Sequence, residues 1–338
     1  MERGRPRDFD FAAYLEAKYA IDSASLNAPL YARFRDHLRR TLDPRILDLG
    51  TGTGAMLRRI LDLELPGRVH MVGLDQEERN LAAGVERMEH ALLVRGYTIG
   101  EKIQSPEVKS VRGEKGGREM RIEFQRGDLL DRRTTDELGS FDFITAHAFM
   151  DLLPLKLAVG IIRRLLGAEG VFYSTLNYDG LTVLLPEYGK GGFERRLLQI
   201  YDRSMENRRS GGRKTGGSLS GRRLYRELLE GGFAILGMGS SDWTVFPSGG
   251  AYAEQQKLFL TALLSMIEGE ASRFGTGSGA GKTAVDPAML ADWYAERLEA
   301  LRDNRLALIV HQLDLLARPA RAKSHSINNF SRRPTPLL

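Results

Sequence analysis

The spacing of apolar residues changes period early in the chain. At first it is helical, with one apolar stripe from Phe11 to Ile21 and a second from Leu30 to Leu38, so residues 9 to 40 are predicted to form two helices. Further on, short apolar runs alternate with stretches of helical periodicity. This alternation predicts an α/β fold, a doubly wound and mostly parallel sheet with helices on both faces.

Seven runs are predicted to be strands, and the first five of them are joined mostly by single helical crossovers. The strands are Arg45 to Leu49, Val69 to Leu74, Met120 to Gln125, Phe141 to Ala146, Gly170 to Leu176, Phe233 to Met238 and Leu306 to Leu316. The helices between them cover about residues 55 to 63, 77 to 95, 154 to 166 and 220 to 231. Sheets of this kind bind ligands at the carboxyl ends of their strands, so residues there are the functional candidates.

Three segments depart from this alternation. Residues 99 to 118 are polar and rich in glycine and lysine, which indicates an excursion before the third strand. The other two are residues 178–219, after the fifth strand, and the helical segment 251–303, between the last two strands. We expect five parts: an N-terminal helical cap (1–43), a cofactor-binding core (44–177), an insertion (178–219), the rest of the core (220–317) with a helical insertion at 251–303, and a disordered basic tail (318–338). The helices of the cap and of 251–303 are expected to roof the ligand edge of the sheet.

Composition excludes several kinds of chemistry. At 338 residues with 42% hydrophobic content, the chain is long enough to bury a large core. It has no cysteine, which excludes disulfides, thiolate zinc sites, thiol nucleophiles and iron-sulfur clusters, and its six scattered histidines do not suggest a metal site. No apolar run is long enough for a membrane span and no signal segment is evident, so we expect a cytoplasmic protein without membrane contact.

The net charge of +5 would suit a polyanionic partner, but much of the excess lies in the ends and loops. The tail after Leu316 carries five basic residues and no acidic one. A solubilising tail is favoured over a nucleic-acid-binding arm.

The most informative segment is Ile46–Gly54, an apolar strand that ends in an acid and three alternating glycines. Glycine at every second position allows a sharp turn and a close approach of the backbone to a ligand. A tight turn between a strand and a helix would give the same letters. The spacing is G-x-G-x-G, one residue shorter than the G-x-G-x-x-G fingerprint of nicotinamide cofactors.

Two acids further along strengthen the prediction of an adenosyl cofactor. Asp75 ends the second strand 21 residues after Gly54, near the spacing at which a carboxylate accepts ribose hydroxyls. Asp128 and Leu129 follow the third strand, where a carboxylate can accept a hydrogen bond from an exocyclic amine. Each acid has a plain alternative role, at a strand end or as the cap of a turn.

Together these residues resemble the class I S-adenosylmethionine-dependent methyltransferases. The family's first motif is matched by Asp48, Gly50, Gly52 and Gly54, its ribose acid by Asp75, its adenine-side acid by Asp128, and its segment after the fourth strand by Ala146–Phe149. The resemblance implies S-adenosylmethionine as cofactor and a seven-stranded sheet whose antiparallel last strand is reached from the sixth. It also implies cofactor contacts from Thr51, Gln76, Leu129 and Ala146. Later segments, such as Gly239–Trp243, resemble more loosely uncharacterised bacterial methyltransferase-like proteins.

The acceptor side is less well defined. Methyl transfer is an in-line displacement, so a general base is needed only where the nucleophile carries a proton. His147, at the end of the fourth strand, is the candidate base, although a hydrogen-bonded structural histidine is an equally ordinary explanation. The candidate acceptor contacts lie at the ends of the fifth and sixth strands and in the last one. They are Asn177, Tyr178, Asp179, Ser241, Asp242, Trp243 and His311.

The acceptor is predicted to be the oxygen or nitrogen of a small molecule. Methylases of base amino groups place a polar residue, two prolines and an aromatic where this chain has Ala146–Phe149, and cytosine-carbon methylases need a cysteine. RNA methylation and a non-catalytic protein that binds the cofactor remain alternatives.

Overall fold

The computed structural model describes residues 11–275 and 285–321. The strands are β1 (Arg45–Leu49), β2 (Arg68–Asp75), β3 (Thr98–Gln104), β4 (Val108–Lys115), β5 (Arg118–Arg126), β6 (Phe141–His147), β7 (Leu166–Leu185), β8 (Arg209–Ser210), β9 (Arg213–Lys214), β10 (Phe233–Ser240), β11 (Trp243–Val245) and β12 (Ala307–Pro319). The α-helices are α1 (Phe11–Ser25), α2 (Ala28–Arg40), α3 (Ala55–Leu61), α4 (Glu78–Val94), α5 (Arg132–Leu138), α6 (Leu155–Leu165), α7 (Phe193–Glu206), α8 (Ser220–Glu230), α9 (Glu254–Gly275) and α10 (Pro287–Arg302).

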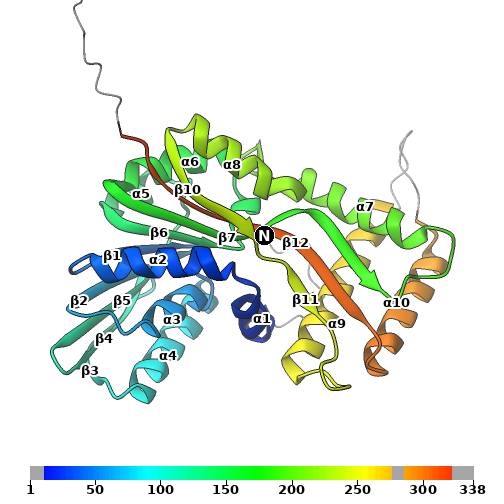
Figure 1. Ribbon diagram of the computed structural model, residues 1–338, viewed down its shortest axis with the longest axis horizontal. Helices are drawn as coiled ribbons and strands as arrows, with labels where there is room; N and C mark the ends of the chain where they lie inside the picture. Colours follow the sequence, from blue (N-terminus) through cyan, green and yellow to red (C-terminus); the bar gives the residue numbers. More distant parts are fainter. Residues whose placement is uncertain (1–10, 276–284, 322–338) are drawn as a thin grey trace, which may run out of the picture.

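Ten of the strands form one twisted sheet with helices on both faces (Figure 1). Its order is β10-β12-β7-β6-β1-β2-β5-β4-β3, and β11 pairs with β12. The five central strands β5, β2, β1, β6 and β7 are parallel, and β12 runs antiparallel between β7 and β10. The predicted doubly wound fold with an antiparallel last strand is therefore confirmed, although the sheet has more than seven strands.

Two of the additional strands come from the segment predicted to be a polar excursion before the third strand. β3 and β4 form an antiparallel hairpin, and β4 pairs antiparallel with β5, so residues 99–118 extend the sheet. Most of β3 is exposed, as a strand at a sheet edge can be, and this is why its composition is polar. The turn from β4 to β5 contains Gly116 and Gly117, both at positive φ, the pair that two-residue hairpin turns favour.

Each face of the sheet carries its own hydrophobic cluster. Helices α2, α3 and α4 cover one face and α5, α6 and α8 the other. Phe34 of α2 is fully buried, with its ring centroid 4.7 Å from that of Tyr173 and 5.9 Å from that of Phe143. Both N-terminal helices were expected to roof the ligand edge of the sheet. Instead α2 covers a face of the sheet, and only α1 lies at the ligand edge.

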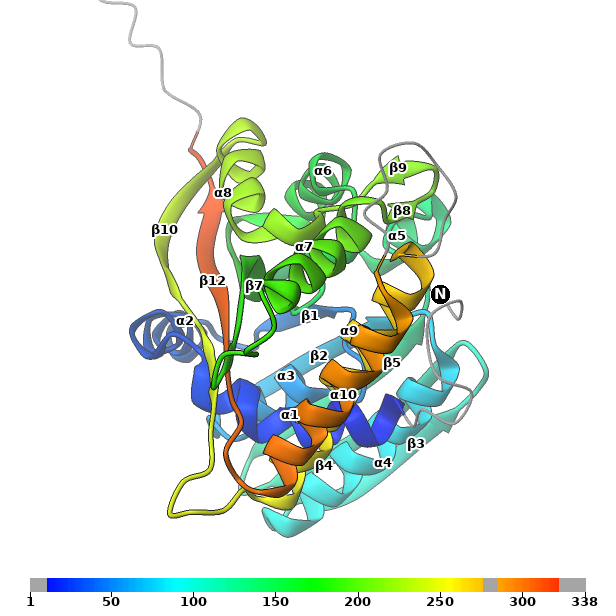
Figure 2. The same cartoon turned by 90° about the vertical axis from the view of Figure 1, so that its right-hand side faces the viewer.

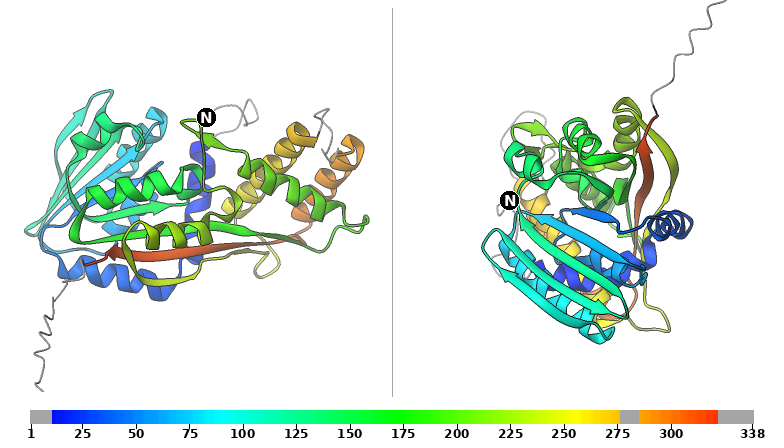
Figure 3. Two further views of the ribbon diagram at one scale, coloured as in Figure 1. Left: turned by 90° about the horizontal axis from the view of Figure 1, so that it is seen from above. Right: turned by 90° about the vertical axis from the view of Figure 1, so that its left-hand side faces the viewer.

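Two strands are much longer than the others and carry a third cluster. β7 and β12 stay paired from Phe172 opposite Ala317 to Leu185 opposite Ala307, well beyond the ends of β6 and β10 (Figure 3). Helices α1, α7, α9 and α10 pack together on this extension (Figure 2). The predicted strand at Gly170–Leu176 is thus a short part of β7, and the first residues of the expected insertion 178–219 continue that strand.

The chain end also differs from expectation. β12 extends to Pro319, and Arg318 and Arg321 lie within 4.0 Å of Glu169, so the first residues of the predicted disordered tail are ordered. The rest of that tail lies outside the described residues. Across the described ranges, no helix combines the length and the apolar character that crossing a membrane requires.

Candidate cofactor and acceptor site

The glycine loop connects β1 to α3 at the carboxyl edge of the sheet. Gly50, Gly52 and Gly54 have φ of 61°, 54° and 82°, the left-handed region that side chains disfavour. The loop is fixed by its own backbone, because Thr51 N–H donates to the Leu74 carbonyl (3.1 Å) and Gly54 N–H to the Thr51 carbonyl (2.9 Å). Helix α3 begins directly after it.

Asp48 lies beneath this loop and fixes it to two strands. The side chain is 1% exposed, and its two oxygens accept hydrogen bonds from the hydroxyls of Thr51 and Thr145, each at 2.7 Å. Burial raises the pKa of Asp48 to about 6, although both hydroxyls act in the opposite direction. Asp48 and Thr51 therefore position the loop, and their polar atoms are occupied within the protein.

Asp75 at the end of β2 faces the loop from the other side. Its Oδ2 accepts the Gly52 N–H and its Oδ1 accepts the Glu77 N–H, both at 2.9 Å. Burial raises the pKa of this carboxyl. Each carboxylate oxygen can accept two hydrogen bonds, so capacity for a ligand hydroxyl remains. Gln76 beside it is exposed.

Asp128 and Leu129 follow β5, on the same edge. Asp128 is half-buried and its Oδ1 accepts the Leu130 N–H at 2.8 Å, which closes the turn after the strand. Leu129 is buried against the face that carries α5 and α6. Asp128 thus caps the turn through Oδ1, and among the described residues no donor is bonded to its Oδ2.

The space over the glycines is filled by side chains. A Cβ on Gly50 would lie 2.2 Å from a ring carbon of Phe149, and one on Gly52 would lie 3.2 Å from Leu15 of α1. The glycine loop, Asp75 and Asp128 together present hydrogen-bond donors and acceptors that suit the sugar and base of an adenosyl group. A ligand that touched Gly50 would have to displace the Phe149 ring.

His147 ends β6 beside the buried Ala146 and is enclosed by α1, α3 and β7. Its Nδ1 lies 2.6 Å from the Thr175 hydroxyl and its Nε2 lies 3.0 Å from Asp22 Oδ2. Burial, together with the charge of Arg59, lowers the pKa of His147 to about 4, although Asp22 opposes the shift. The imidazole is therefore neutral at pH 7, and the arrangement assigns its proton to Nε2, facing Asp22.

Asp22 of α1 is the centre of the network around His147. It is 2% exposed and also accepts hydrogen bonds from Lys18 Nζ (2.5 Å) and Trp243 Nε1 (2.9 Å). Burial alone would raise the pKa of Asp22, but Lys18 and His147 outweigh it and lower the pKa to about 2. Asp22 therefore joins two sequence-predicted residues, His147 and Trp243, that lie on different strands.

Sequence reasoning missed Asp22 because its partners are 125 and 221 residues away. Lys18 and Asp22 are spaced like an ordinary solvated i, i+4 pair on a helix, so no local pattern marked them.

The other predicted acceptor contacts divide into two groups. Asn177 is 2% exposed, and its amide is held by the Ser174 hydroxyl and the Leu313 carbonyl, each at 2.8 Å. The Tyr178 hydroxyl donates to Asp202 of α7 at 2.8 Å. The polar atoms of these two side chains are therefore occupied within the protein, and Tyr178 packs against the same hydrophobic cluster as Trp243.

The second group consists of Asp179, Ser241, Asp242 and His311. Asp179 pairs with Arg222 through two guanidinium nitrogens, Nη2 at 2.8 Å from Oδ2 and Nε at 3.0 Å from Oδ1. His311 Nδ1 lies 2.8 Å from Asp242 Oδ1. The neighbouring Ser241 is buried, and its N–H donates to the Gln312 carbonyl at 2.9 Å. Asp179 and His311 therefore do not share the network of His147 and Trp243.

Comparison with known proteins gives matches among solved structures only. No protein-family model matches the chain, and no curated protein matches it. A methyltransferase from Thiobacillus denitrificans, named as dependent on S-adenosylmethionine and solved with S-adenosylhomocysteine, aligns over 94% of this chain and 99% of its own, at 11% identity and a TM-score of 0.45.

Two further structures match over a similar share of this chain. A geranyl diphosphate C-methyltransferase from Streptomyces coelicolor covers 86% of this chain and 80% of its own, at 12% identity and a TM-score of 0.40. A phosphoethanolamine N-methyltransferase from Haemonchus contortus covers 92% and 58%, at 13% identity and a TM-score of 0.42. All three identities are below 25% and all three TM-scores below 0.5, so the matches carry no conclusion about the function of this chain.

Proposed function

We propose that the protein is an S-adenosylmethionine-dependent methyltransferase that acts on oxygen or nitrogen of a small-molecule acceptor. The observation that carries the proposal is the hydrogen bond between Gly52 N–H and the Asp75 carboxylate. It joins the glycine loop after β1 to the acid that ends β2, two of the elements on which the resemblance to this enzyme family depends.

In this proposal the loop and the two acids hold the cofactor. The backbone of Gly50 and Gly52 lies against it, Asp75 accepts its ribose hydroxyls, and Asp128 and Leu129 lie beside its adenine. The bound cofactor supplies an electrophilic methyl group. Asp48 and Thr51 hold the loop in shape from below, and the Phe149 ring moves off Gly50.

On the acceptor side, the polar network under α1 is the best supported candidate. Because Nε2 of the neutral His147 carries its proton toward Asp22, Nδ1 is the atom that would take up a proton from an acceptor, once the Thr175 hydroxyl turns away from it or relays the proton. The ionised Asp22 beside Nε2 would stabilise the imidazolium that forms. Trp243 shares Asp22 with His147 and is the predicted acceptor contact with the strongest support. A small acceptor is favoured over RNA because α1 lies across this edge of the sheet.

Calorimetry with S-adenosylhomocysteine tests the cofactor site. We expect the wild-type protein to bind it and Asp75→Ala to bind it about 10- to 100-fold more weakly, because hydrogen bonds to a charged group contribute ~1.5–3 kcal/mol. Asp131→Ala is the matched control, since Asp131 is an exposed acid that caps α5. A wild-type protein that binds neither S-adenosylhomocysteine nor S-adenosylmethionine at millimolar concentration refutes the proposal.

An acceptor screen tests the activity. Labelled methyl donor is offered with a metabolite extract and, in parallel, with total RNA, using the wild-type protein and Asp75→Ala. Label in the small-molecule fraction that depends on Asp75 supports the proposal, whereas label in RNA alone favours an RNA methyltransferase. Cofactor binding without transfer to either fraction favours a non-catalytic binding protein.

A further inference from the structure

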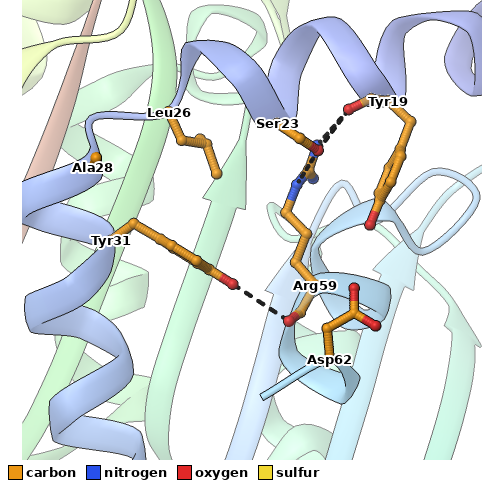
Figure 4. Close-up of a pocket in the computed structure, with 7 residues that line it drawn as sticks. All are labelled: Tyr19, Ser23, Leu26, Ala28, Tyr31, Arg59 and Asp62. Atoms are coloured by element: carbon orange, nitrogen blue, oxygen red, sulfur yellow. Dashed lines mark hydrogen bonds between the residues drawn. The ribbon is translucent and has the colours of Figure 1, made fainter. Parts of the chain in front are cut away.

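A pocket of about 370 Å³ lies between α1, α2 and α3, beside the candidate site (Figure 4). Such a volume is within the range of small-molecule pockets, which combine apolar walls with a few polar groups. This one is lined by Tyr19, Ser23, Leu26, Ala28, Tyr31, Arg59 and Asp62.

The unusual member of this lining is Arg59, whose side chain runs from α3 up to α1 (Figure 4). The residue is 4% exposed. Its Nε donates to the Ser23 hydroxyl and its Nη2 to the Tyr19 carbonyl, both at 3.1 Å. Its Nη1 lies 3.5 Å from Nε2 of His147, which carries no charge at pH 7. All three contacts are therefore with uncharged groups.

No carboxylate forms a direct ion pair with Arg59. Within residues 11–275 and 285–321, none lies within 4.0 Å of its guanidinium nitrogens. The acids near Arg59 have other partners. Asp22 is bound by Lys18 and His147, and Asp62 of the pocket lining is paired with Arg95. Asp48, whose raised pKa the charge of Arg59 lowers in part, accepts hydrogen bonds from Thr51 and Thr145 instead. A buried charge without a counter-ion is costly, so an anion that entered here would gain a strong interaction.

We propose that this pocket binds the carboxylate of a small organic acid through Arg59, and that this acid is the methyl acceptor. The inference rests on the proposed function, because it is the contact between Arg59 and His147 that joins the pocket to the candidate site. The rings of Tyr19 and Tyr31 and the apolar Leu26 suit an acid with an apolar or aromatic body. A planar guanidinium binds a carboxylate through two parallel hydrogen bonds, which favours it over a neutral amide.

Calorimetry with benzoate and its neutral analogue benzamide tests the pocket, on the full chain with saturating S-adenosylhomocysteine. We expect the wild-type protein to bind benzoate at least about tenfold more tightly than benzamide, since a charge-assisted hydrogen bond is roughly twice as strong as a neutral one. Arg59→Met should abolish this preference. Arg68→Met, which removes an exposed arginine paired with Asp43, is the matched control and should keep it.

A second variant keeps the test valid if Arg59→Met does not fold. Ser23 is exposed and its hydroxyl accepts the Arg59 Nε–H, so Ser23→Asp would supply the missing counter-ion from within the chain. We expect this variant to have a higher Tm than the wild type and to lose the preference for benzoate.

Three results would overturn the proposal. The wild type could bind benzoate and benzamide equally well, or Ser23→Asp could keep the preference for benzoate. Alternatively, Arg59→Met could lose affinity for S-adenosylhomocysteine while it keeps its affinity for benzoate. The last would assign Arg59 to the carboxylate of the cofactor. The benzoate titration is repeated on the wild type without S-adenosylhomocysteine. If benzoate is still preferred there, but the separate titration shows no binding of S-adenosylhomocysteine, the anion pocket is supported and the proposed function is overturned.

Discussion

At the scale of single residues, the buried ionisable groups at the sheet edge respond to burial in opposite directions. Burial raises the pKa of the acid Asp48 to about 6 and lowers that of the base His147 to about 4. In both cases the neutral form gains, as expected where water is excluded. Asp22 is the exception, because Lys18 and His147 hold it ionised.

The lowered pKa of His147 predicts a pH dependence of stability. Between its ordinary value of 6.5 and about 4, the unfolded chain binds a proton at this site and the folded chain does not. The stabilisation is therefore complete above pH 6.5 and is lost as the pH falls toward 4, by about 3 kcal/mol. Urea unfolding at pH 7 and pH 4.5 should show that His147→Gln removes this part of the dependence.

The exposed His90 on α4 provides the control, because His90→Gln should leave the pH dependence as in the wild type. Asp48 acts in the opposite sense over part of this range, so the comparison between variants, not the wild-type slope, isolates His147. Identical slopes for both histidine variants would contradict the assignment of a buried neutral imidazole.

Phe149 leads to a prediction of the opposite sign from that for Asp75. Its ring lies against Gly50, in the space that a cofactor would use, so binding has to include the cost of moving it. We expect Phe149→Ala to bind S-adenosylhomocysteine about tenfold more tightly, or ~1.4 kcal/mol, in the same calorimetric assay. Phe246→Ala, at a phenylalanine that is 50% exposed, should not change the affinity. Weaker binding by Phe149→Ala would mean that the ring contacts the ligand.

At the scale of elements, α1 is the helix that closes the candidate site. Leu15 packs over Gly52, Asp22 bonds to His147 and Trp243, and Arg59 bonds to the Tyr19 carbonyl. These contacts are spread over two turns of the helix, from residue 15 to residue 22. The accessibility of the glycine loop therefore depends on how firmly α1 is held.

Asp22→Asn tests this dependence. The amide keeps one acceptor oxygen but no charge, so Lys18 loses its counter-ion, and the donors Trp243 and His147 share one acceptor. We expect peptides from residues 11–27 to exchange their amide hydrogens faster and S-adenosylhomocysteine to associate faster. Asp36→Asn on α2, at an exposed acid, should change neither rate. Unchanged exchange in α1 of Asp22→Asn would show that other contacts hold the helix.

The elements were predictable from the sequence where a local period marks them. The central strands, both N-terminal helices and the crossover helices α3, α4, α6 and α8 follow from apolar spacing, whereas the short α5 was not predicted. Helix α7 had such a signal in Phe193, Leu197, Ile200 and Tyr201, all buried on one side, but the glycines around it obscured the period. The β4–β5 hairpin had its signal in the glycine pair of its turn, Gly116 and Gly117.

The network under α1 could not be predicted in this way. Asp22, His147 and Trp243 come together only when the sheet order and the position of α1 are known, and none of them is marked by its neighbours in sequence. The glycine loop and Asp75 were found because a strand, a turn and an acid leave a local signature at a fixed spacing. Arg59 has no such signature beside Arg58, which pairs with Glu16.

At the scale of the whole molecule, the three hydrophobic clusters are distributed unevenly over the chain. Two of them share the central strands, while the third depends on the far ends of β7 and β12 and on four helices. At its centre, Glu194 of α7 accepts hydrogen bonds from Trp293 (2.8 Å) and Arg297 (2.7 Å) of α10. Arg297 is 1% exposed and also donates to the Pro186 carbonyl.

Glu194→Gln should therefore loosen the third cluster selectively. The variant leaves the Arg297 charge buried without a counter-ion, which costs about 3–5 kcal/mol where a buried pair is broken. We expect hydrogen exchange to accelerate in α7, α9 and α10 while β1, β2 and β6 stay protected. Asp292→Asn, which breaks the exposed pair with Lys190, should cost less than about 1 kcal/mol. Equal acceleration in the central strands would mean that all three clusters unfold as one unit, and that the helices beside the candidate site cannot open independently of the sheet.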